Sequence, residues 1–373
     1  MSKRKKKKKK SASFGFWSPR VMEFLHQERR FIFLFGFFFL IAAATYRQPQ
    51  IAMWVGFLFA AYSAVANDSI QTIGTFLASN SDKKWWLLWI WIGGIFLATV
   101  TYSWVTFSGD VTYQRLTSRG FEEAPAQFKF LQIAAPLFLL ILTRLRMPVS
   151  TTFLLLSVFA TSPDGIVDIL QKSLLGYGIA FVLAFGLWMV LSRLFDRWFN
   201  GTPAGYWQPI QWVVSGSLWA VWLMQDAANI AVFLPRSLEL SGFLAFAGII
   251  FCGLGILLYL RGDKIQQIVM DKSHVTDVRS ATVIDAVYAS ILFYFKTVSV
   301  VPMSTTWVFI GLLAGREIAI TVRSAGPSRN ISKTVRLISR DATYAIIGLI
   351  VSILIAIAVN PVILDELMSF ILS

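Results

Sequence analysis

Long apolar stretches separated by short polar segments dominate the chain. They cover about residues 31–46, 51–66, 85–108, 130–145, 174–195, 210–224, 241–260, 284–295 and 341–360. A helix that crosses a bilayer needs roughly 20 apolar residues, so most of these stretches are predicted to span a membrane. Charged residues are only 14% of the 373 and mean hydropathy is +0.64, which excludes a soluble domain. The pattern predicts an all-α polytopic membrane protein.

Four shorter apolar pieces lie between the long ones, near residues 69–79, 149–160, 227–234 and 304–315. They follow a polar pair or a proline: Asn67-Asp68, Pro148, Gln225-Asp226 and Pro302. These pieces are too short to cross a bilayer alone, so we expect them to be half-helices. The helices are therefore predicted to be broken at membrane depth, where irregular backbone is tolerated only beside a cavity or buried in protein.

Both halves of the chain carry the same polar signatures in the same order. Trp54, Asp68 and Gln71 pair with Trp212, Asp226 and Asn229 at an offset of 158 residues. Two further matches follow, Gly109-Asp110 with Gly262-Asp263 and Pro148-Val149-Ser150-Thr151-Thr152 with Pro302-Met303-Ser304-Thr305-Thr306. Three matches at near-constant spacing predict an internal duplication, with repeats at 51–195 and 196–373.

The distribution of basic residues predicts the orientation. We take 1–30 as a cytoplasmic tail, 31–50 as an extra first helix, and 130–160 and 284–315 as re-entrant hairpins. Each repeat then crosses three times, which inverts the second repeat. Of the 34 basic residues, 25 fall on the cytoplasmic side and six outside, as the positive-inside rule requires. This predicts a multi-pass protein of the cell (plasma or inner) membrane with a cytoplasmic N-terminus.

The N-terminal tail carries eight consecutive basic residues, Lys3 to Lys10, which contribute much of the net charge of +14. In a membrane protein such a run is expected to lie against anionic lipid, and we predict no nucleic-acid partner. There is no P-loop, GxSxG or HExxH motif and only one cysteine. The chain is therefore expected to be neither an enzyme nor driven by ATP, and to need no cofactor beyond a coupling ion.

Inverted repeats with broken helices are typical of secondary transporters, which bind their cargo at mid-membrane between the halves. Asp68 and Asp226 adjoin apolar helices, where an ionised carboxylate is costly and therefore functional by default. Their polar neighbours are Asn67, Gln71, Thr72, Gln225 and Asn229. Together these oxygens suit a hard cation such as Na⁺. Capping of the following half-helices is the simpler role for both aspartates and is compatible with cation binding.

The two Pro-x-Ser-Thr-Thr phrases place hydroxyls at predicted helix starts: Ser150, Thr151, Thr152, Ser304, Thr305 and Thr306. A helix start has open N–H groups and a positive dipole end, which favours anions. Packing between helices is the alternative, but two copies after prolines favour an anion site. Three basic residues precede the phrases, Arg144, Arg146 and Lys296. They either attract an anion or snorkel toward the interface.

These phrases resemble those of the PiT inorganic phosphate transporter family. Ala66-Asn67-Asp68 with Gln71 is similar to its Gly-Ala-Asn-Asp-Val-Ala-Asn phrase, with a second copy at Gln225-Asp226-Ala227-Ala228-Asn229. Pro148 to Thr152 resembles its Pro-Val-Ser-Thr-Thr-His phrase, with Arg144-Leu145-Arg146 before it. The resemblance covers 54–160 and 212–315. It implies cation-coupled uptake of inorganic phosphate, with Asp68 and Asn229 joining the six hydroxyls as phosphate ligands.

The chain departs from that family within the predicted site. Phe153 and Trp307 stand where the family has histidine after Ser-Thr-Thr, and Gln71 and Gln225 replace asparagines. The leading prediction is a secondary symporter that carries inorganic phosphate with Na⁺ or H⁺ by alternating access, and the alternative is the same scaffold carrying sulfate or another oxyanion. An uncoupled anion channel is a rival, as is a non-transporting scaffold, which would have no reason to keep two costly aspartates. A homodimer is left open.

Overall fold

The computed structural model describes residues 28–66, 68–118, 120–145, 149–198, 201–260, 277–323, 331–360 and 365. Throughout these ranges every regular element is helical. Seven of the helices are long and apolar enough to cross a membrane. The predicted all-α membrane fold is therefore confirmed. The basic tail to residue 27, Asn67, Arg146 and Pro148 lie outside the described residues, as does the side chain of Gln71.

Two parts of the chain, residues 1–41 and 42–373, are distinct in their contacts and are described separately. Residues 29–41 belong to helix α2 (Arg29–Thr45), in which the rings of Phe31 and Phe35 lie 4.0 Å apart. All other helices belong to the second part. The predicted boundaries of the tail and the extra first helix stay predictions.

The predicted first repeat contains α3 (Pro49–Ala66), α4 (Asp68–Ser79), α5 (Trp85–Thr106), η1 (Arg115–Thr117), α6 (Phe130–Arg144), η2 (Thr152–Leu156), η3 (Ser157–Phe159) and α7 (Pro163–Trp198). The second contains α8 (Trp207–Ala231), α9 (Leu240–Tyr259), α11 (Val278–Val298), α12 (Thr305–Arg323) and α13 (Ile331–Val359). Most of the predicted segments coincide with these helices to within a few residues. The predicted inversion of the second repeat stays a prediction.

Helix α8 runs without interruption through Gln225 and Asp226, so the predicted break at this position is wrong. The polar side chains find partners without unwinding the backbone. Gln225 Nε2 donates to the carbonyl oxygen of Leu292 at 3.0 Å, and Asp226 accepts hydrogen bonds from three side chains. Satisfied polar groups are tolerated inside a helix bundle, so the sequence signal for a break was a signal for buried contacts.

Three helices are longer than the sequence pattern predicts. Helix α7 begins at Pro163 rather than near 174, so Lys172, expected in an external segment, is a buried residue of this helix. Helices α11 and α12 are 21 and 19 residues long, and each is long enough to cross a membrane. The segment 299–304 separates them, as predicted for the second hairpin. The re-entrant course of both hairpins stays a prediction.

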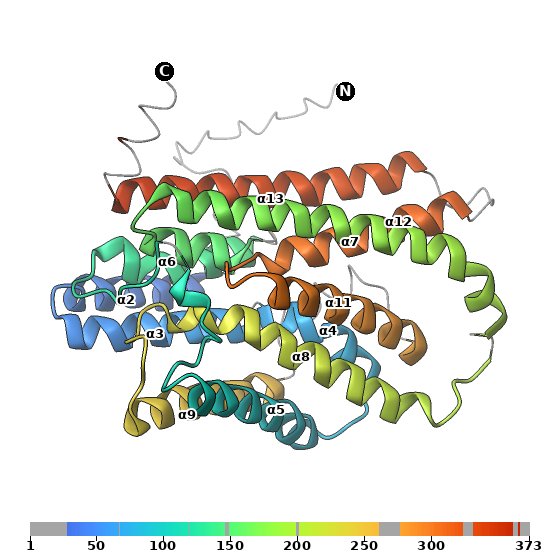
Figure 1. Ribbon diagram of the computed structural model, residues 1–373, viewed down its shortest axis with the longest axis horizontal. Helices are drawn as coiled ribbons and strands as arrows, with labels where there is room; N and C mark the ends of the chain where they lie inside the picture. The colour runs from blue at the N-terminus through green and yellow to red at the C-terminus, as the bar shows by residue number, and fades with distance from the viewer. Residues whose placement is uncertain are drawn as a thin grey trace, which may run out of the picture. The chain divides into compact units, whose positions relative to one another are not determined.

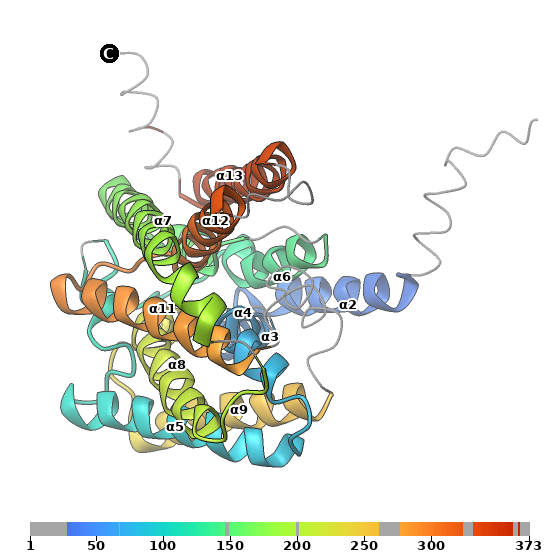
Figure 2. The same cartoon turned by 90° about the vertical axis from the view of Figure 1, so that its right-hand side faces the viewer.

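Helices α7, α12 and α13 pack side by side (Figures 1 and 2). The contact between α7 and α12 is close because glycines face it. A Cβ atom added at Gly311 would collide with the backbone carbonyl of Tyr177, and one added at Gly315 would collide with that of Phe181. Such small residues let helix backbones approach closely in membranes. We call this contact the glycine seam.

Aromatic side chains join α5 to α9, the helices that occupy matching places in the two repeats. The rings of Trp104 and Phe243 stack at 4.7 Å, and those of Trp89 and Phe251 also lie 4.7 Å apart. Trp89 Nε1 donates to the carbonyl oxygen of Phe251 at 2.9 Å. Buried aromatic pairs add about 0.5–1.5 kcal/mol each beyond their area. This pairing fixes α5 and α9 beside the helices that carry the site.

Candidate functional site

Asp226 is the centre of a buried polar cluster. Its side chain lies on α8 and is 2% exposed. Oδ1 accepts from Asn229 Nδ2 at 2.5 Å and from Thr152 Oγ1 at 3.4 Å, and Oδ2 accepts from Thr305 Oγ1 at 2.7 Å. Asn229 lies three residues along the same helix, which places it on the same face. The arrangement stabilises a buried carboxylate through hydrogen bonds to its charged form.

The two Pro-x-Ser-Thr-Thr phrases meet at this carboxylate. Thr152 comes from the first phrase and Thr305 from the second. Their serines behave alike, because Ser150 Oγ accepts from the amide of Phe153 at 3.2 Å and Ser304 Oγ accepts from the amide of Trp307 at 3.2 Å. The same local geometry in both copies supports the predicted duplication. Thr306 is also buried.

Three buried polar atoms around the cluster have no hydrogen-bond partner among the described residues: Gln225 Oε1, Asn229 Oδ1 and Thr151 Oγ1. The amide of Asn229 is oriented with its nitrogen toward the carboxylate, because a carboxylate only accepts. Its oxygen therefore points elsewhere. Buried polar atoms without partners are uncommon in folded proteins, and a cluster of them indicates a place for a ligand.

A cavity of about 20 Å³ adjoins Asp226, with apolar walls that include Val65, Trp222 and Phe246. This volume accommodates about one water-sized body. A tetrahedral oxyanion does not fit into it. Its lining residues come from α3, α5, α8 and α9 and include none of the hydroxyls of the two phrases, so this cavity is not the oxyanion site.

Asp68 lies in the first turn of α4 and is 3% exposed. Thr72 Oγ1 donates to the backbone carbonyl of Asp68 at 3.0 Å. Its predicted companions Asn67 and Gln71 lie outside the description of side chains. Of the first group of predicted cation ligands, the structure therefore describes the side chains of Asp68 and Thr72 only. Of the second group, it describes Gln225, Asp226 and Asn229.

Asp285 is a further buried carboxylate that the sequence analysis did not single out. It lies on α11, is 1% exposed, and accepts from Thr75 Oγ1 at 2.7 Å and from Ser215 Oγ at 2.5 Å. It thereby joins α4 and α8 to α11. Asp285 could have been found by the feature that marked Asp226, which is a carboxylate inside an apolar stretch of the sequence.

The basic residues predicted to attract an anion lie in different surroundings. Lys296 Nζ lies 5.5 Å from the centre of the Tyr113 ring, and Arg144 is partly buried in the last turn of α6. Two other basic side chains are buried near the cluster, Arg115 of η1 and Lys172 of α7. Both donate to backbone carbonyls of the segment between α11 and α12. The count of basic residues on each side of the membrane placed both in predicted external segments.

Phe153 and Trp307, which occupy the places of the family's histidines, contact each other. Their ring centres lie 5.6 Å apart at an interplanar angle of 60°, an edge-to-face arrangement. Both rings are almost completely buried. The two Ser-Thr-Thr phrases are therefore followed by aromatic rings that contact each other and do not titrate.

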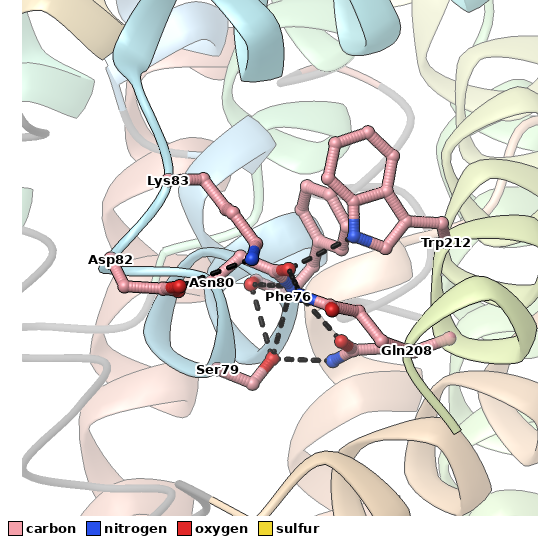
Figure 3. Close-up of polar contacts among 8 residues, drawn as sticks. Phe76, Ser79, Asn80, Asp82, Lys83, Gln208 and Trp212 are labelled. Atoms are coloured by element: carbon pink, nitrogen blue, oxygen red, sulfur yellow. Dashed lines mark hydrogen bonds and ion pairs between the residues drawn. The ribbon is translucent and has the colours of Figure 1, made fainter. Parts of the chain in front are cut away.

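An amide network joins the end of α4 to the start of α8 (Figure 3). Asn80 Nδ2 donates to Gln211 Oε1 at 2.9 Å and to the carbonyl oxygen of Phe76 at 2.9 Å. Asn80 Oδ1 accepts from Trp212 Nε1 at 2.9 Å. Asn80 is completely buried. The network fixes the far end of the half-helix that begins at Asp68.

Replacing Asn80 with leucine is expected to lower the free energy of unfolding by about 2 kcal/mol or more, because two buried groups lose their partner. Thermal unfolding of the purified protein followed by tryptophan fluorescence measures the change. The matched control is Gln208→Leu, since Gln208 Nε2 reaches Asn80 Oδ1 only at 3.4 Å. Equal melting of the two variants would contradict the assigned role of Asn80.

Comparison with known proteins gives one informative likeness. A solved structure described as "The sodium-dependent phosphate transporter" superposes with a TM-score of 0.50 over 86% of this chain and 99% of that chain, at 16% identity. The protein shares its fold with that transporter. No family model matches the sequence, and no curated protein does. At this identity the likeness shows the fold alone.

Proposed function

We propose that this protein is a secondary transporter that carries inorganic phosphate across the membrane together with a cation. The observation that carries the proposal is a pair of buried amide oxygens on α8 that flank Asp226 in sequence. Gln225 Oε1 and Asn229 Oδ1 have no donor among the described residues, and the amide of Asn229 contacts the carboxylate of Asp226. Amide and carboxylate oxygens are the ligands that a hard cation selects.

The cation is Na⁺ rather than H⁺. An amide oxygen is neutral and does not take up a proton near neutral pH, whereas it is a good ligand for an alkali cation. The carboxylate of Asp226 supplies the negative charge. The solved structure that shares this fold is described as sodium-dependent, which agrees with the choice.

The oxyanion binds where the two Ser-Thr-Thr phrases meet. Helix α12 begins at Thr305, so its dipole presents a positive end there, and Ser304 Oγ already accepts from the amide of Trp307. The hydroxyl of Thr151, without a partner among the described residues, is a donor for an anionic oxygen. Hydroxyls and helix amides hold phosphate without a fixed positive charge.

The hydrogen bonds of Asp226 suggest how the two ligands are coupled. Thr152 and Thr305 donate to its two carboxylate oxygens. A cation bound at the carboxylate competes with these hydroxyls and releases them to donate to the oxyanion. Binding of one ligand thereby favours the other, and this coupling acts equally in both directions.

Transport of labelled phosphate into liposomes that contain the purified protein tests the proposal. An inward Na⁺ gradient is expected to drive accumulation, and an equal K⁺ gradient is not. Unlabelled phosphate is expected to compete better than sulfate. Uptake that does not depend on the cation would instead indicate a channel, and uptake of sulfate alone would overturn the choice of substrate.

A further inference from the structure

Arg115 contacts three backbone carbonyls that belong to two different helices and to the segment between α11 and α12. Its side chain is 1% exposed. Nε donates to Met224 O of α8 at 3.3 Å, and Nη2 donates to Lys296 O near the end of α11 at 3.3 Å. Nη1 donates to Ser299 O, just beyond α11. A single guanidinium therefore joins α8 to the beginning of the break.

Lys172 of α7 also holds this segment. Its Nζ donates to Ser299 O at 3.1 Å and to Val301 O. Ser299 O thus accepts from both cations. Neither cation forms an ion pair with any carboxylate in the part of the chain that the structure describes. The open carbonyls and negative dipole end of α11 explain why positive charge collects here.

The positions of these carbonyls relate Arg115 directly to the candidate site. Met224 precedes Asp226 by two residues, and Ser299 precedes Thr305 by six. Arg115 and the hydrogen bond from Thr305 Oγ1 to Asp226 Oδ2 therefore both join α8 to the stretch of chain that runs from the end of α11 to the start of α12. While the hydrogen bonds of Arg115 remain, the beginning of this stretch stays fixed to α8, which limits how far the start of α12 can move away.

We propose that Arg115 is a positioning residue that holds the start of α12 against Asp226 and has to release the segment 299–304 when the site opens. The inference rests on the proposed function only for the identity of the ligand that enters when the site opens. Asp226, Thr152 and Thr305 are all buried, so an oxyanion reaches them only after such an opening. Loss of Arg115 removes this connection between α8 and the segment 299–304, so an arrangement in which α12 has moved away from α8 becomes more populated.

Arg236 offers a matched control. It also donates to several backbone carbonyls, those of Phe121, Glu123, Val232 and Leu234. Burial lowers the pKa of Arg115 and of Arg236 to about 10, against the opposing effects of Asp226 and Asp110 respectively, so both stay charged near neutral pH. Arg236 has no hydrogen bond to the described residues at the break between α11 and α12. The two residues thus share their chemistry and differ in what they hold.

The experiment measures how fast a reporter cysteine at the break reacts with a water-soluble maleimide. The reporter is Met303→Cys, at a position that is 0% exposed, in a Cys252→Ser background. Arg115→Met is expected to raise the labelling rate about tenfold, since it favours the open arrangement. Arg236→Met is expected to leave the rate unchanged. Phosphate transport in the same variants is expected to show a raised KM for Arg115→Met.

Arg115→Lys keeps the charge but cannot reach three carbonyls at once, and an intermediate labelling rate is expected. If size-exclusion chromatography shows that Arg115→Met does not fold, the labelling rate of Arg115→Lys tests the proposal instead. Unchanged labelling in the folded Arg115 variants, or an equal rise in Arg236→Met, would overturn the proposal. Labelling needs no transport, so a protein that fails to carry phosphate would refute the proposed function and still test the role of Arg115.

Discussion

Asp226→Asn is expected to abolish Na⁺-driven phosphate uptake, with a fall of about 100-fold or more, because a charged hydrogen-bonded group contributes up to about 3 kcal/mol. The substitution keeps the size of the side chain but removes its charge. It also turns one accepting oxygen into a donor that faces the Asn229 amide or a threonine hydroxyl. Initial rates of labelled phosphate uptake into liposomes measure the loss.

Asp82→Asn is the control for this substitution. The side chain of Asp82 is 70% exposed, and its ion pair with Lys83 at 3.1 Å is of a kind that contributes little. Uptake by this variant is expected to match that of the parent. Retention of Na⁺-stimulated uptake by Asp226→Asn, within about twofold of the parent, would show that the carboxylate is not needed for coupling.

Gly315→Leu is expected to destabilise the protein more than any other single change considered, by about 3 kcal/mol or more. A side chain at this position meets the backbone of α7 at Phe181, which cannot move aside as a flexible side chain would. Helices α7 and α12 would have to separate along the glycine seam. Thermal unfolding and the fraction of monodisperse protein after extraction measure the effect.

Gly178→Leu tests whether the effect belongs to the seam. Gly178 lies on α7 and is exposed, and a Cβ atom added there would meet no neighbouring atom within 4 Å. Leucine there is expected to face lipid and to leave unfolding unchanged. A similar loss of stability in both variants would mean that added bulk destabilises these helices outside the seam as well, and the special role of the seam would be disproved.

Most of the helices could be predicted because their apolar runs are long and their ends carry polar residues. The prediction failed at α8, where Gln225 and Asp226 looked like a break. What keeps this helix intact is a set of partners distant in sequence, among them Leu292 O, Thr152 and Thr305. A single sequence does not reveal such partners. Polar residues at membrane depth therefore identify buried contacts more securely than they identify breaks.

The candidate site could be predicted in part because it is duplicated. The repeated phrases pointed to Thr152, Thr305 and Asp226, and the structure brings these three together. Arg115 and Lys172 could not be found in this way, since their partners are backbone carbonyls, which leave no trace in residue types. Counting charges by side of the membrane placed them in external segments, which stays a prediction.

The glycine seam has a mechanical consequence. Backbones in direct contact cannot slide past each other easily, so α7 and α12 would turn as one rigid body. Lys172 and Ser173 of α7 hold Ser299, Val301 and Ser304, which adds the segment between α11 and α12 to the same body. Any rocking motion would then separate this body from α8. Asp226 of α8 lies at that boundary, and its hydrogen bond to Thr305 of α12 forms or breaks as the body moves.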